Sequence, residues 1–75
     1  MKDIKKILDE ILDAGYEDSL DYLEDGYMDS LQVMELVDAI EENYGIELSG
    51  KDIVPENFVN QEMIVKLLRK YGVEE

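Results

Sequence analysis

The sequence predicts an all-α fold, a small bundle of three main helices with a short helix before the last one and a long loop between the first two. Three stretches carry apolar residues at helical spacing, and each lies between a capping residue and a glycine. The 75 residues suffice for one small core, and no repeat, low-complexity tract or linker divides them. We therefore expect a single domain over residues 1–75.

The first expected helix lies near the start of the chain. Asp3 can cap its beginning, and Gly15 is expected to end it. One face should be buried, because its apolar residues recur at i, i+3 and i+4. These residues are Ile4, Ile7, Leu8, Ile11 and Leu12.

The loop from Gly15 to Asp29 is longer than the usual connection between packed helices. This length indicates a functional or adaptable element. Gly26 can supply a positive-φ turn shortly before the second helix. The residues expected to anchor the loop to the core are Tyr16, Leu20, Leu23 and Tyr27.

The second expected helix runs from Ser30 to Tyr44 and ends at Gly45. Asp29 is a good N-cap, and Gln32 can complete a capping box by reaching back to the backbone N–H of the cap. Ser30 is then the first helical residue, so its hydroxyl is not used as the cap and can face solvent. The inward stripe comprises Val33, Leu36, Val37, Ile40 and Tyr44.

The last part of the chain predicts a turn, a short helix and a third main helix. Residues 49–52 indicate a turn, and Pro55 disfavours helical geometry at Val54, so a short helix is expected to begin at Pro55. The last helix can begin after an Asn60 cap and end at Gly72. Its apolar residues are Met63, Ile64, Leu67, Leu68 and Tyr71. Three amphipathic helices must pack together to bury their stripes.

Charge and composition restrict the function. The formal net charge of −13 argues against nucleic acid and anionic membranes as partners, and favours a basic protein partner. The chain has no Cys and no His, which removes thiolate chemistry and the usual general base, so we expect no enzymatic activity. No segment is apolar enough to span a bilayer, and the N-terminus lacks a secretory signal. A cytoplasmic monomer is expected.

The acidic loop partly matches a calcium-binding pattern. Four residues fall at positions one, five, six and nine of a twelve-residue calcium loop, namely Asp21, Asp25, Gly26 and Asp29. However, Leu23 and Gln32 stand where two further ligands are required. We expect no specific metal site, and only weak, screening association of Mg²⁺ or Ca²⁺ with the carboxylates.

The helix start at Ser30 resembles a known motif. The Asp29-Ser30-Leu31 triplet, followed by Glu35-Leu36-Val37 and by residues 39–48, is similar to the phosphopantetheine attachment region of the acyl carrier protein superfamily. The resemblance implies an acyl-carrier-like fold and a covalent 4′-phosphopantetheine arm on Ser30, whose thiol holds an acyl or aminoacyl group as a thioester. It also implies a phosphopantetheinyl transferase, a loading ligase and downstream transferases as partners.

The cargo stays open between fatty acyl, D-alanyl and other aminoacyl groups. Fatty-acid carriers usually place a glycine close before the serine motif, whereas here Gly26 lies further upstream. This spacing, and the segment at residues 55–58, look more like the D-alanyl and aminoacyl carrier proteins.

Four residues of the second helix are candidates for partner docking. Leu31 and Met34 lie beside the inward stripe, so they are either exposed contacts for a docking enzyme or peripheral core, with equal support. Glu35 and Glu41 match acidic positions that meet basic patches on partner enzymes in the resembled family. The alternative function is a non-modified acidic helical adaptor that binds a basic partner, in which Ser30 only starts a helix.

Overall fold

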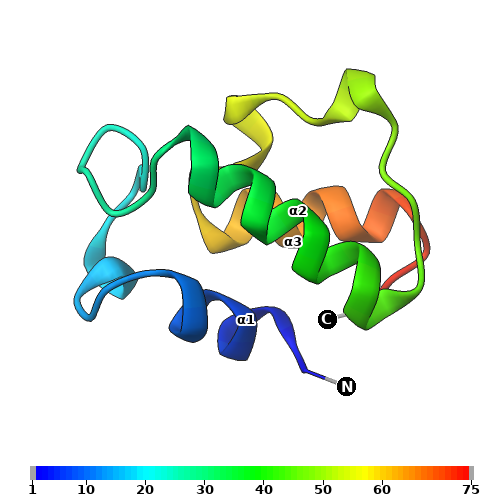
Figure 1. The fold of residues 1–75 in the computed structure, drawn as a ribbon, viewed down its shortest axis with the longest axis horizontal. Helices are drawn as coiled ribbons and strands as arrows, with labels where there is room; N and C mark the ends of the chain where they lie inside the picture. Colours follow the sequence, from blue (N-terminus) through cyan, green and yellow to red (C-terminus); the bar gives the residue numbers. More distant parts are fainter. Residues whose placement is uncertain (1, 75) are drawn as a thin grey trace.

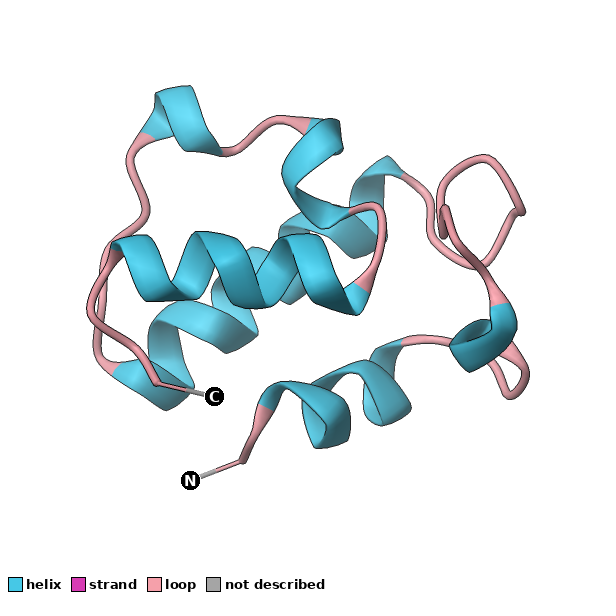
Figure 2. Ribbon diagram, turned by 180° about the vertical axis from the view of Figure 1, so that it is seen from behind, coloured by secondary structure: helices cyan, strands magenta, loops and turns pink. Residues whose placement is uncertain are grey.

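The chain forms a bundle of helices in the computed structural model, which describes residues 2–74. The elements, in which η marks a short 3₁₀ turn, are α1 (Ile4–Ile11), η1 (Tyr16–Asp18), α2 (Ser30–Tyr44), η2 (Gly50–Asp52), η3 (Pro55–Phe58) and α3 (Gln61–Lys70). Figure 1 shows α1, α2 and α3 gathered around a common interior, with the shorter elements in the connections. The described residues contain no strand (Figure 2), so the predicted all-α class is confirmed.

Helix α1 begins as predicted and ends earlier than predicted. The Asp3 side chain accepts a hydrogen bond from the N–H of Lys6 at 2.9 Å. The helix stops at Ile11, because the backbone at Leu12 is extended while its side chain stays buried. The expectation that Gly15 ends this helix is therefore wrong. Gly15 instead has a φ of 101° and is the cap residue that precedes η1.

Helix α2 has the predicted bounds, and its inward stripe is confirmed for four of its five residues. Val33, Leu36, Val37 and Ile40 are buried, whereas Tyr44 is half-buried at the end of the helix. The helix ends at Gly45, whose N–H donates to the carbonyl of Glu41.

The segment after α2 contains two 3₁₀ turns. The predicted turn at residues 49–52 contains η2, and Pro55 opens η3 after an extended Val54, as its ring requires. Helix α3 is capped by Asn60, whose side chain accepts from the N–H of Met63 at 2.9 Å. Met63 itself is half-buried, so it lies at the edge of the core stripe.

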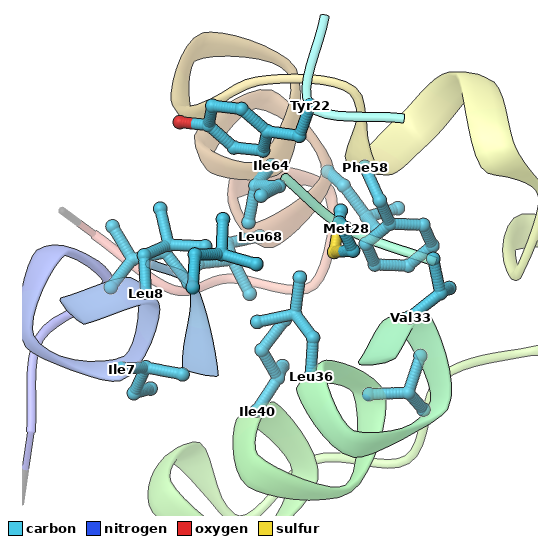
Figure 3. Close-up of a cluster of buried hydrophobic side chains, with 14 of the residues drawn as sticks. Ile7, Leu8, Tyr22, Met28, Val33, Leu36, Ile40, Phe58, Ile64 and Leu68 are labelled. Atoms are coloured by element: carbon cyan, nitrogen blue, oxygen red, sulfur yellow. The ribbon is translucent and has the colours of Figure 1, made fainter. Parts of the chain in front are cut away.

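The core lies where the three main helices meet (Figure 3). Each helix contributes side chains with essentially no exposure, and η3 adds one aromatic ring. These side chains are Leu8, Leu36, Ile40, Phe58, Ile64 and Leu68. Because burying one large apolar side chain contributes about 1.5–3 kcal/mol, this shared interior holds the helices in place.

Three of the four predicted anchors of the long loop are confirmed, and two residues that were not predicted also anchor it. Tyr16, Tyr22 and Met28 are buried, and Leu23 and Tyr27 pack partly against the core. Tyr16 and Tyr22 meet edge to face, with ring centroids 5.6 Å apart. Burial raises the pKa of Tyr16 to about 12, and its hydroxyl donates to the carboxylate of Asp9 on α1. These aromatic contacts hold the first half of the loop.

Leu20 was expected to be an anchor, and this expectation is wrong, because its side chain is 84% exposed. Its carbonyl accepts from the Asn60 side chain at 2.9 Å, and the N–H of Tyr22 donates to the carbonyl of Val59 at 2.7 Å. These bonds pin the loop to the start of α3 in an orientation that leaves Leu20 in solvent.

No helix within residues 2–74 is long and apolar enough to cross a bilayer.

Candidate functional site

The start of α2 is closed by a reciprocal pair of hydrogen bonds. Asp29 is extended, and its Oδ1 accepts from the N–H of Gln32 at 2.8 Å. The Oε1 of Gln32 accepts in turn from the N–H of Asp29 at 2.9 Å. The capping box predicted from the sequence is therefore confirmed. It makes Ser30 the first residue of a regular helix.

Ser30 is exposed and chemically available. Its hydroxyl makes no hydrogen bond within residues 2–74. The backbone N–H groups of Ser30 and Leu31 also lack an acceptor in that part of the chain, because they precede the first intrahelical bond, from Val33 to Asp29. Unpaired N–H groups and the positive end of the helix dipole suit an anionic group. A phosphodiester on the Ser30 hydroxyl therefore fits this helix start.

The approach to Ser30 is a folded turn. Gly26 has the predicted positive φ, 82°. The N–H groups of Tyr27 and Met28 both donate to the carbonyl of Tyr22, at 2.8 and 3.0 Å. The side chain of Met28 is buried two residues before Ser30 (Figure 3). Met28 and Tyr22 were not predicted as anchors, and the only sequence signal for them was their apolar character.

Two acidic residues of the loop, Asp21 and Asp25, accept hydrogen bonds from within the loop. Oδ1 of Asp21 accepts from the N–H groups of Leu23 and Glu24, at 3.0 and 2.9 Å. The hydroxyl of Ser19 donates to the carboxylate of Asp25. The described residues contain no group of three or more acidic, His or Cys side chains placed to hold a metal ion. The hydrogen bonds of Asp21 and Asp25 help to organise the loop.

Leu31 and Met34 are exposed. Their side chains are 69% and 47% exposed, so the alternative of peripheral core is wrong for both. Glu35 is exposed on the same helix. The first turns of α2 therefore present apolar and acidic groups beside Ser30, which is the composition of a surface that can contact a partner.

The side chain of Glu41 makes a contact that the sequence did not predict. It is half-buried, and its Oε2 accepts from the backbone N–H of Leu48 at 2.8 Å. This bond ties the segment after α2 back to the helix. Glu41 also lies eleven residues beyond Ser30, roughly 16 Å along the helix axis. The structure therefore does not bring Glu41 close to Ser30.

The electrostatic surroundings of Ser30 are one-sided. Residues 7–50 contain many carboxylates and no Lys or Arg. The cations lie at the start of the chain, at Lys51 and on α3. A partner that approaches Ser30 therefore meets negative charge, and a basic surface is its natural complement.

Comparisons with known proteins agree on the kind of site. A family model described as "Phosphopantetheine attachment site" matches residues 2–57, which include Ser30. The chain is similar to an acyl carrier protein of Buchnera aphidicola subsp. Schizaphis graminum (strain Sg), with 41% identity over 63 residues and 80% of each chain covered. No solved structure gives a significant match.

Proposed function

The chain belongs to the acyl carrier protein superfamily and bears a covalent 4′-phosphopantetheine group, and we propose that Ser30 is the residue to which this group is attached. The observation that carries the proposal is the exposed, unbonded hydroxyl of Ser30 at a capped helix start. When attached, the group supplies a thiol that holds acyl cargo as a thioester. The protein is thus a carrier and not an enzyme.

The residues around Ser30 present the hydroxyl. Asp29 holds the first turn through the N–H of Gln32, so it orients the helix start. The N–H groups of Ser30 and Leu31 are directed out of the helix end, where they can bind phosphate oxygens. The non-modified adaptor accounts for the charge and the helix stripe, but not for the family match, so the carrier function is preferred.

The chain interacts with a phosphopantetheinyl transferase and with acyl-handling enzymes, as its family does. We assign docking to Leu31, Met34 and Glu35, which lie exposed within the first turns of α2. Glu41 lies in the C-terminal half of α2, farther from Ser30, and would be a further acidic contact for a partner enzyme. Docking through few exposed groups gives brief, salt-sensitive encounters, which suit a carrier that visits several enzymes.

The sequence supports a proposal for the cargo of the carrier. The position of Gly26 resembles that in D-alanyl and aminoacyl carrier proteins, and this resemblance supports an aminoacyl cargo such as D-alanine. An adenylate-forming ligase would then load the thiol, and downstream transferases would remove the cargo. We propose that the protein works as a cytoplasmic monomer of one domain over residues 1–75.

The test of the attachment site is a mass measurement. The unmodified protein is incubated with coenzyme A, Mg²⁺ and a phosphopantetheinyl transferase of broad specificity, and its intact mass is recorded. We expect the parent to gain one phosphopantetheine, located on Ser30 by peptide mapping, and Ser30→Ala to gain none. Equal gain by Ser30→Ala would place the attachment elsewhere, and no gain by folded parent protein with several transferases would favour the adaptor.

A further inference from the structure

The side chain of Gln32 joins two helix ends that are far apart in the sequence. Its Oε1 accepts from the N–H of Asp29, and its Nε2 donates to the carbonyl of Ile11 at 3.2 Å. Ile11 is the last residue of α1, and Asp29 is the cap of α2. Both polar atoms of the half-buried Gln32 amide therefore make hydrogen bonds, one where the loop leaves α1 and one where it enters α2.

The carbonyl of Ile11 is a group that needs a partner. The last carbonyls of a helix have no N–H partner within the helix. A glycine C-cap or a basic side chain often supplies the missing hydrogen-bond donor. Helix α1 has neither, because its C-cap is an extended Leu12 and its last turn has no basic residue. Gln32 thus closes the end of α1 and the start of α2 at once.

We infer that Gln32 is a positioning residue for modification, because it holds the first turn of α2, and with it the Ser30 hydroxyl, at a fixed place relative to α1. This inference rests on the proposed function of Ser30. Tyr22 and Met28 are buried within the loop, and the bond from Gln32 to Ile11 adds a polar link between the two ends of the loop.

Position matters because the transfer reaction is sensitive to geometry. The hydroxyl oxygen of Ser30 forms a bond to the β-phosphorus of coenzyme A, its proton passes to a base of the transferase, and adenosine 3′,5′-bisphosphate leaves with the electrons of the broken P–O bond. Displacing a reacting oxygen by about 1 Å can cost up to about 100-fold in rate. A looser first turn should therefore lower the rate of the bound complex more than it weakens binding.

The chain allows a matched set of variants. Gln32→Glu keeps an oxygen for the N–H of Asp29 but turns the donor to Ile11 into an acceptor, whereas Gln32→Met removes both bonds. Gln61→Glu is the control, because it adds the same charge to the first turn of α3. The kcat and KM of phosphopantetheine transfer from coenzyme A are measured for each, together with the NMR order parameters of the Ser30 and Leu31 amides in the unmodified proteins.

We expect both Gln32 variants to lose about threefold to tenfold in kcat, with KM within about twofold of the parent and with lower order parameters at Ser30. Gln61→Glu should match the parent in each quantity. Parental kcat or unchanged order parameters in folded Gln32→Glu and Gln32→Met would overturn the inference. Failure of the parent itself to be modified would instead overturn the assignment of Ser30, and the role of Gln32 in transfer with it.

Discussion

The carboxylate of Asp52 accepts a hydrogen bond from the ammonium group of Lys70 at 2.9 Å and so links η2 to the end of α3. Its other oxygen accepts from the hydroxyl of Tyr71 at 2.6 Å, and that hydroxyl accepts from the N–H of Ser49. Asp52 is the one buried charged side chain among the described residues. The segment between α2 and α3 is thus held by a polar network as well as by Phe58.

This network predicts a dependence of stability on acid pH. The Tyr71 hydrogen bond, followed by the Lys70 ammonium, lowers the pKa of Asp52 below its usual range. Its stabilising effect is therefore complete above the unfolded-state pKa of about 3.9 and is lost as the pH falls through the lower folded-state pKa. We expect Asp52→Asn to lower the melting temperature at pH 7, and the difference from the parent to shrink in strong acid. Melting curves recorded from neutral to strongly acidic pH check this, and a constant difference would contradict it.

The core predicts a large contrast between two leucines of α2. Leu36 is fully buried, whereas Leu31 is 69% exposed. Leu36→Ala should lower the free energy of unfolding by about 2–5 kcal/mol, because it leaves a cavity among packed helices. Leu31→Ala should change it by about 0.5 kcal/mol or less. Urea unfolding of the two variants measures both values, and similar losses would mean that the buried face of α2 is misassigned.

The sequence predicts α2 and its site well because their determinants are local. The cap, the box residue and Ser30 lie within one helical turn, so the propensities of Asp29 and Gln32 suffice to place the hydroxyl. The bond from Gln32 to Ile11 is different, because it joins residues that only the packing of α1 against α2 brings together. No pattern along the chain encodes that meeting.

The loop shows the same limit more clearly. Leu20 and Tyr22 are both apolar and lie two residues apart, yet only Tyr22 is buried. The choice depends on backbone bonds to Val59 and Asn60, which lie far along the chain at the start of α3. Burial in an irregular segment is set by such distant partners, whereas burial in a helix follows its period.

The backbone at Gly15 predicts a specific loss on substitution. Its φ of 101° is rarely adopted by residues with a side chain, and an added Cβ would lie 3.2 Å from the hydroxyl oxygen of Tyr27. Gly15→Ala should therefore lower the free energy of unfolding by about 1–2 kcal/mol. Gly50→Ala is the control, since nothing lies within 4 Å of the added atom and its φ is ordinary. Chemical unfolding should show a near-neutral Gly50→Ala, and equal losses would contradict the strain at Gly15.

The charge distribution predicts stabilisation by salt. The formal net charge is −13, and residues 7–50 contain no cation, so the carboxylates of the folded chain repel one another. Raising the ionic strength from about 10 mM to about 150 mM shortens the screening length from about 30 Å to about 8 Å. The melting temperature should rise with salt, and millimolar Mg²⁺ should have a similar effect. An unchanged melting temperature across the series would count against this repulsion.

The exposed acid beside Ser30 predicts a charge-dependent encounter with the transferase. Glu35 is exposed on α2, five residues after Ser30, whereas Glu62 is exposed on α3. If a basic partner surface meets α2, Glu35→Lys should raise the KM of phosphopantetheine transfer about tenfold and leave kcat nearly unchanged, while Glu62→Lys changes both little. The two substitutions alter the net charge equally, so a difference between them reports the docking face and not overall attraction. The effect of Glu35→Lys should also weaken as salt is added, because exposed charges are screened. Equal KM values for the two variants would remove Glu35 from the docking surface and leave Leu31 and Met34 as its candidates.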